Sequence, residues 1–115
     1  MIQLSPGMRV FIHVDPVDFR NGIDGLAGAC RRRLMQDPMS GAVFLFINRQ
    51  RKSLKLLVYD GQGFWLCQKR LSKGRFRYWP AGMSQLTAPQ LHVLLYDGHP
   101  DASDIAPAWK PLSSI

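Results

Sequence analysis

Carboxylates are the first residues to examine for catalysis in this chain, because they serve as acids, bases and metal ligands in many enzymes. The sequence of 115 residues contains no glutamate. Most of its aspartates stand where turns or helix caps are expected, namely Asp15, Asp18, Asp37, Asp60 and Asp97. Two-metal phosphoryl transfer needs several carboxylates clustered around its metal ions. The sequence therefore predicts no catalytic residue, no metal site and no cofactor.

The histidines and glycines support the same prediction. His13, His92 and His99 show no metal-ligand spacing with one another or with the cysteines. His13 and Asp15 form an isolated H-x-D pair, which we do not interpret as a site. Asp60-Gly-Gln-Gly63 is typical of a hairpin turn rather than of a phosphate-binding loop.

The cellular compartment follows from the cysteines and from the lengths of the apolar segments. Cys30 and Cys67 both lie in apolar segments, so we expect two buried free thiols in a reducing compartment. The longest apolar run, Ala42 to Ile47, is far shorter than the ~20 residues that span a bilayer. The N-terminus lacks the pattern of a secretory signal. The sequence predicts a cytoplasmic protein without a membrane partner.

Positive charge is concentrated in one segment. The net charge is +7 and the sequence pI is about 10.0, values that favour polyanionic partners. The segment from Arg49 to Arg77 holds nine basic residues and one acid, Asp60, whereas the rest of the chain holds six basic and seven acidic residues. We predict that this segment binds nucleic acid; the alternative is a solvated surface that only keeps the chain soluble. The nine predicted binding residues are Arg49, Arg51, Lys52, Lys55, Lys69, Arg70, Lys73, Arg75 and Arg77.

Two helices are expected from the spacing of apolar residues and from capping signals. Phe19, Ile23, Leu26, Cys30 and Leu34 recur at helical spacing, which predicts an amphipathic helix with Asp18 as its N-cap. Thr87-Ala-Pro-Gln90 is typical of a capping box and predicts a short helix over Leu91 to Tyr96.

Five strands are expected from β-branched and aromatic residues between turn signals. They cover Met8 to Val14, Val43 to Arg49, Leu54 to Asp60, Phe64 to Leu71 and Arg75 to Trp79, and the last four are predicted to form a meander. The predicted fold class is α+β: a twisted antiparallel β-sheet in the order β-α-β-β-β-β-α, with a helix packed on one face. We expect one domain over residues 1–98 and a loosely ordered C-terminal tail over 99–115.

Alternation along the predicted strands gives the sheet two different faces. The aliphatic face holds Val43, Leu45, Ile47, Leu54, Leu56, Val58, Trp65, Cys67 and Leu71. We predict that Leu45, Leu56, Val58 and Trp65 are buried there against Leu26 and Cys30 of the first helix. The other face mixes aromatic and basic side chains: Phe44, Phe46, Lys55, Leu57, Tyr59, Phe64, Leu66, Gln68, Arg70, Phe76 and Tyr78.

The mixed face has two possible interpretations. Aromatic rings interleaved with cations can stack bases and neutralise phosphates, and the candidate stacking residues are Phe46, Tyr59, Phe76 and Tyr78. Alternatively, this face is a second core covered by the short helix or by a partner subunit. Both interpretations stay open at the level of the sequence.

A series of motifs in order resembles one known family. The first part runs through Asp18-Phe-Arg20-Asn-Gly22-Ile-Asp24-Gly25-Leu26, Asp37-Pro-Met-Ser-Gly41 and Phe44-Leu-Phe46-Ile-Asn48-Arg49-Gln-Arg51. The second part runs through Lys55-Leu-Leu57, Asp60-Gly61, Gly63-Phe64, Lys69-Arg70-Leu71, Gly74-Arg75-Phe76 and Trp79-Pro80. Together they resemble the TnpB accessory proteins, the second open-reading-frame products of insertion sequence 66 family elements. The RNA-guided nuclease also called TnpB is a different protein.

The resemblance implies a product that acts beside a separate transposase with an Asp-Asp-Glu metal triad. It carries no catalytic residue onto this chain. Together with the basic segment and the missing carboxylates, it leads us to predict a non-catalytic accessory role in transposition, with element DNA and the element-encoded transposase as partners. One alternative is a protein–protein adaptor for the transposase that does not contact DNA. A second is a minor nuclease activity, which would need a carboxylate cluster that the sequence does not show. The chain departs from the family pattern at Val58-Tyr59, where a more aromatic pair is usual, and after Gly98.

Overall fold

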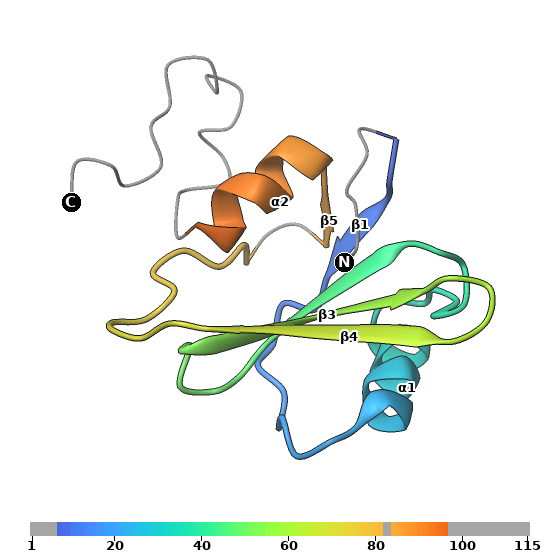
Figure 1. Cartoon of the computed structure of the whole chain (residues 1–115), viewed down its shortest axis with the longest axis horizontal. Helices are drawn as coiled ribbons and strands as arrows, with labels where there is room; N and C mark the ends of the chain where they lie inside the picture. The colour runs from blue at the N-terminus through green and yellow to red at the C-terminus, as the bar shows by residue number, and fades with distance from the viewer. Residues whose placement is uncertain (1–6, 82–83, 97–115) are drawn as a thin grey trace.

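The predicted α+β fold class is confirmed by a computed structural model, which describes residues 7–81 and 84–96 (Figure 1). An open sheet of five strands carries two helices. In chain order the elements are β1 (Val10–Ile12), α1 (Ile23–Arg33), β2 (Val43–Ile47), β3 (Ser53–Tyr59), β4 (Phe64–Arg70), β5 (Gln85–Leu86) and α2 (Ala88–Leu95). The predicted tail over 99–115 lies outside the described residues.

The sheet is mixed, so the prediction of an entirely antiparallel sheet is wrong at one pair of strands. The strand order is β4-β3-β2-β1-β5. β1 pairs with β2 in parallel, whereas β2–β3, β3–β4 and β1–β5 are antiparallel. Helix α1 makes the crossover between β1 and β2 and returns the chain to the end of the sheet where β1 began.

The predicted strand from Arg75 to Trp79 is also wrong. This segment crosses the sheet at its end as irregular chain, held by the Phe76 amide, which donates to the Arg51 carbonyl at 2.7 Å, and by the Trp79 indole, which donates to the Val14 carbonyl at 3.0 Å. The alternation that indicated a strand comes from Phe76, whose side chain is buried while its neighbours are exposed. The fifth strand is instead the short β5, at the sheet edge opposite to β4.

The predicted sorting of side chains into two faces is confirmed for β2, β3 and β4. Directly opposite pairs include Leu45 with Leu56 on one face and Phe44 with Leu57 on the other. The aliphatic cluster lies on the first face, where strand residues pack with Leu91 and Leu94 of α2 and with Phe76. The aromatic cluster lies on the second face, where Phe11, Phe44, Phe46 and Leu57 pack with Leu26, Ala27, Ala29 and Cys30 of α1.

The helix that covers each face is the reverse of the prediction. Leu26 and Cys30 of α1 pack against the aromatic cluster, and α2 covers the aliphatic cluster (Figure 1). Both faces are apolar, so alternation alone could not decide between the two helices. Trp65 was predicted to be buried, but its side chain is 48% exposed because it lies on β4 at the edge of the sheet.

The two helices differ in how their N-termini are capped. The capping box at α2 is confirmed: the Gln90 amide donates to Thr87 Oγ1 at 3.2 Å and the Thr87 amide donates to Gln90 Oε1 at 2.9 Å. That helix begins at Ala88, three positions before the predicted Leu91. Asp18 is not the N-cap of α1, which begins at Ile23 after Gly22, because the Asp18 carboxylate bonds instead to Arg20.

Candidate nucleic-acid interface

The turn between β2 and β3 carries the first group of predicted binding residues. Asn48 organises this turn with its side-chain oxygen, which accepts hydrogen bonds from the amides of Lys52 at 3.1 Å and Ser53 at 3.2 Å. The Asn48 carbonyl accepts from the Arg51 amide at 3.0 Å. Arg51 closes the turn with a φ of 61°, in the left-handed region. The turn therefore presents Arg49, Arg51 and Lys52 on a hydrogen-bonded backbone.

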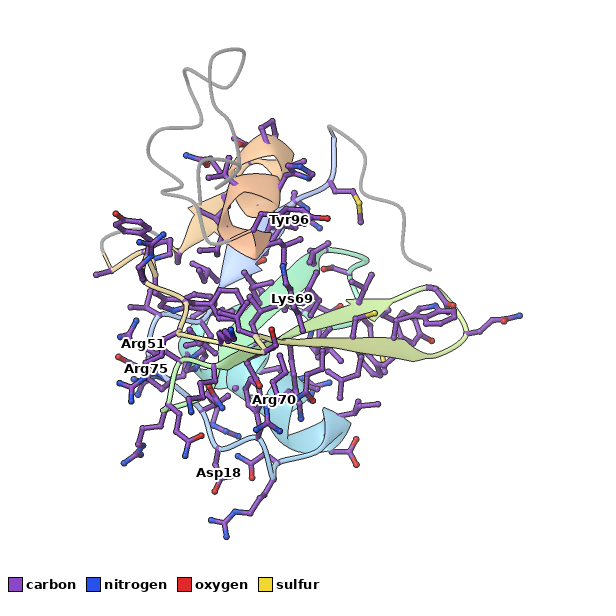
Figure 2. All side chains as sticks on the ribbon, turned by 60° about the vertical axis from the view of Figure 1, so that its left-hand side comes forward. Asp18, Arg51, Lys69, Arg70, Arg75 and Tyr96 are labelled. Carbon is purple, nitrogen blue, oxygen red and sulfur yellow. The ribbon has the colours of Figure 1, made fainter. Side chains whose placement is uncertain are left out.

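A second basic loop, which follows β4, is bonded to this turn. The Leu71 amide donates to the Lys52 carbonyl at 2.9 Å, and the Phe76 amide donates to the Arg51 carbonyl. Segments far apart in sequence thus place six cations at one end of the sheet, where Arg51, Arg70 and Arg75 are labelled in Figure 2. We call this group the basic end; it consists of Arg49, Arg51, Lys52, Arg70, Lys73 and Arg75.

Two clefts border the basic end. One of about 340 Å³ is lined by three of its cations, Lys52, Arg70 and Lys73, together with Leu71, Ser72 and Gly74. The other, of about 780 Å³, lies between the turn at Asn48 and the segment before α1, and its lining includes Arg49, Arg20 and Asp18. The smaller cleft has the charge and the size to take a phosphate group.

Lys55 and Lys69 do not join the basic end. Lys55 is buried, and its ammonium donates to the Phe19 carbonyl at 3.1 Å and lies 4.6 Å from the centre of the Phe19 ring. Lys69 donates to the Leu95 carbonyl at the end of α2 and lies 4.4 Å from the centre of the Tyr96 ring (Figure 2). Both ammonium groups therefore stabilise the fold in this structure.

The remaining predicted cation and the candidate stacking residues are dispersed. Arg77 is exposed, with its guanidinium 5.9 Å from the centre of the Tyr78 ring. Phe46 and Phe76 are buried in the aromatic and aliphatic clusters, so neither can offer a ring face to a base. Tyr59 stands at the opposite end of β3 from the basic end, with its ring against Phe64. Among the four candidates, Tyr78 alone is substantially exposed, at 40%.

Arg20 is a neighbour of the basic end that sequence reasoning missed. Its side chain pairs with Asp18 at 2.7 Å, and both residues line the larger cleft with Arg49. The hydrogen bonds from Arg20 lower the pKa of Asp18 to about 2, and the charge of Arg49 contributes. Charge counting placed Arg20 in the neutral remainder of the chain, whereas the D-x-R spacing was the available signal for this pair.

Neither a cluster of metal ligands nor a membrane-spanning helix is found in the part of the chain that the structure describes. Within residues 7–81 and 84–96, no three His, Cys, Asp or Glu side chains come together in a group that could hold a metal ion. Over the same residues, neither helix has the length and apolar character needed to cross a bilayer. Both cysteines are free thiols; Cys30 is buried and Cys67 is half-buried.

Comparison with known proteins identifies clear sequence relatives. The sequence profile of the family described as "IS66 Orf2 like protein" matches residues 8–102. The uncharacterized protein y4jC of Sinorhizobium fredii is 36% identical over 99 residues, which cover 85% of each chain. The uncharacterized protein y4hO of the same organism is 36% identical over 117 residues, which cover 96% of each chain. No solved structure matches significantly.

Proposed function

The chain belongs to the family of IS66 Orf2-like proteins, and on this premise we propose that it assists insertion-element transposition by binding DNA through the basic end. The family connects the chain with the transposition machinery. The proposed role is non-catalytic, and the element-encoded transposase is the partner that would cut and join DNA. The proposed ligand of the basic end is the sugar–phosphate backbone.

The observation that carries this proposal is the convergence of two basic loops. Hydrogen bonds from Leu71 to Lys52 and from Phe76 to Arg51 join the loops through their backbones. Neither loop contains a carboxylate, since residues 48–52 and 70–76 hold no Asp or Glu. Six cations are thus held on a connected backbone, which lowers the entropy lost when they bind a polyanion together. Several phosphates of one strand can be neutralised at once.

Convergence on a cleft distinguishes the basic end from a surface that only keeps the chain soluble. Arg49, Lys52, Arg70, Lys73 and Arg75 are all exposed, and Arg51 is half-buried. Three of the six line one cleft, which is an arrangement that a phosphate can use and that solubility does not require. The burial of Phe46 and Phe76 supports phosphate contacts, rather than base stacking, as the main interaction.

The test is DNA binding across a salt series, with duplex and single-stranded element ends. Replacing Arg49, Arg51 and Lys52 together by Ala should weaken binding and lower the slope of log K against log salt by about one unit per cation. The loss should be about equal for any DNA sequence. The matched control replaces Arg31, Arg32 and Arg33 of α1 by Ala, which removes the same charge outside the basic end.

The outcomes are distinct provided that circular dichroism shows each variant to be folded. Equal losses of DNA affinity in both triple variants would show that net charge, rather than the position of the cations, controls binding. Unchanged affinity and slope in the Arg49, Arg51 and Lys52 variant would refute the site.

A protein–protein adaptor is the second candidate function, and exposed aromatic side chains favour it. Trp65, Tyr78 and Tyr96 are each between 40% and 49% exposed, and such rings are common at protein interfaces. An adaptor predicts that the wild-type protein binds purified transposase but not DNA. DNA binding that survives charge removal at the basic end would also favour the adaptor.

A further inference from the structure

Strand β4 has an open outer edge. It is the terminal strand in the order β4-β3-β2-β1-β5, and within the described residues no strand pairs with its outer side (Figure 1). It runs for seven residues without proline, and from Phe64 to Gln68 it carries no charge. Proteins usually protect such edges with charges, proline or bulges, because unpaired backbone groups recruit another strand. The outer side of β4 is therefore a candidate interaction surface.

Hydrogen bonds at both ends of the β3–β4 ladder show which groups point outward. The Asp60 amide donates to the Gly63 carbonyl at 3.0 Å, and the Leu71 amide donates to the Lys52 carbonyl at 2.9 Å. In an antiparallel ladder, hydrogen-bonded and non-hydrogen-bonded positions alternate. Trp65, Cys67 and Lys69 therefore direct their backbone groups toward β3. The residues that direct theirs to the open edge are Phe64, Leu66, Gln68 and Arg70.

We propose that β4 pairs antiparallel with β4 of a second copy of this chain, about a two-fold axis at Cys67. Cys67 is the midpoint of β4, so this register uses all seven residues. Leu66 then exchanges backbone hydrogen bonds with the partner's Gln68, and Phe64 with the partner's Arg70. All four of these residues direct backbone groups outward, so the register satisfies the edge without shifting the strand.

The side chains of β4 explain why the partner is a second copy. Aromatic residues occupy its beginning, Phe64 and Trp65, and cations occupy its end, Lys69 and Arg70. Antiparallel self-pairing sets Phe64 opposite the partner's Arg70, which permits a cation–π contact, while Lys69 keeps its ammonium on the Leu95 carbonyl and the Tyr96 ring. Parallel self-pairing would set like charges side by side. The sequence of the strand is thus complementary to its own reverse.

This dimer would place two basic ends on one continuous sheet. Six residues separate the paired positions of the two Arg70 residues, so these lie about 20 Å apart along the strands. The basic loops continue outward from Arg70 on each side. The dimer does not depend on the proposed function, because it rests on the backbone of β4, and DNA binding by either basic end could fail without affecting it.

Cysteine crosslinking tests the register directly. In the proposed pairing the two Cys67 residues form a non-hydrogen-bonded pair with Cα atoms about 4.5 Å apart. That separation is within the range of disulfides. Cys30 is a built-in control, because burial raises the pKa of its thiol to about 12. With diamide as oxidant, wild type and Cys30→Ser should form a covalent dimer, and Cys67→Ser should not.

A proline at the open edge tests the pairing independently of the thiols. The Gln68 amide points away from β3, so Gln68→Pro removes a donor that only the dimer uses. Gln68→Thr keeps the amide and is the matched control. By sedimentation, wild type and Gln68→Thr should show twice the mass of the 13.0 kDa chain. Because the dimer is symmetric, Gln68→Pro removes two hydrogen bonds. The Kd of dimerisation should therefore rise by roughly tenfold or more.

Three results would overturn the proposal: a monomeric wild type, a dimer that forms no disulfide at Cys67, or a folded Gln68→Pro that dimerises like wild type. If Gln68→Pro does not fold, the crosslink decides. Neither crosslinking nor sedimentation uses DNA, so the test of the dimer is independent of the test of DNA binding.

Discussion

The turns at the two ends of β3 use the same hydrogen-bonding pattern, but one acceptor is neutral and the other is negatively charged. At one end the neutral oxygen of Asn48 accepts from the Lys52 and Ser53 amides; at the other end the Asp60 carboxylate accepts from the Gln62 amide at 2.8 Å and the Gly63 amide at 3.0 Å. The Trp65 indole also donates a hydrogen bond to the Asp60 carboxylate at 2.8 Å. A neutral acceptor at the basic end leaves the field of its cations undiminished. The fold therefore accepts a neutral or a negatively charged acceptor at a turn, and the neutral one stands where the proposed DNA-binding cations are.

The largest expected effect is a loss of stability caused by a change in the core of β3, between its two ends. Leu57 is fully buried at the centre of β3, in the aromatic cluster. Leu57→Ala should lower the free energy of unfolding by ~2–5 kcal/mol because it leaves a cavity, whereas Leu57→Met should cost less than ~1.5 kcal/mol. Urea unfolding measures both. Hydrogen exchange that rises at only one end of β3 would contradict a shared core.

Exchanging the two turn acceptors tests the electrostatic difference. Asn48→Asp keeps the oxygen that accepts from Lys52 and Ser53 but adds a negative charge beside the cations. We expect DNA affinity to fall about fivefold, or ~1 kcal/mol, with a lower salt slope. Asp60→Asn removes a charge at the other end and should leave DNA affinity unchanged. Effects of equal size and opposite sign from the two substitutions would show that net charge, rather than position, controls binding.

The Asp60 turn should respond to acid, whereas the Asn48 turn should not. Hydrogen bonds from Gln62, Gly63 and Trp65 hold the pKa of Asp60 below its ordinary value of 3.8. A depressed folded-state pKa contributes stability that is present above the unfolded pKa and is lost as pH falls through the folded pKa. Wild type should exceed Asp60→Asn in stability at neutral pH and approach it below pH 3.8. Urea unfolding at several pH values measures this, and parallel curves would contradict it.

The smallest expected effect concerns backbone strain. The Asp60 turn places Gly61 at its positive φ of 97°, whereas the Asn48 turn places Arg51 at 61°. A side chain costs energy in the left-handed region, where glycine does not. Arg51→Gly should therefore change the free energy of unfolding by less than ~1 kcal/mol, in the stabilising direction, while DNA binding weakens. A gain in stability together with full DNA affinity would show that Arg51 is not retained for binding.

Local patterns gave the fold class, the face of each strand residue and the capping box of α2. These features depend on neighbours in the sequence: alternation sorts Leu56 from Leu57, and Thr87 reaches only as far as Gln90. The parallel pairing of β1 with β2, and the choice of helix for each face, depend on residues far apart in the chain. Since Leu26 and Leu91 are equally able to cover an apolar face, no local pattern could assign them.

The candidate site was only partly visible in the sequence for the same reason. Charge density located the loops that hold Arg49 and Arg75, but not the backbone bonds that bring the loops together. Alternation placed Lys55 on the mixed face without showing that the Phe19 carbonyl holds its ammonium. A cation in a strand and a cation in a loop look alike in a sequence, and burial alone distinguishes them.

The pairing of β1 with β5 has a consequence for the order in which the protein folds. Val10 lies beside Leu86, so nearly the whole described chain must be synthesised before the two can meet. The meander of β2, β3 and β4 joins strands that are neighbours in sequence, and its loops close at small entropic cost. We expect the meander to form first, and the sheet to be completed only after β5 and α2 have been synthesised. On the ribosome, the basic end would then be organised before the N-terminal strand has both of its neighbours.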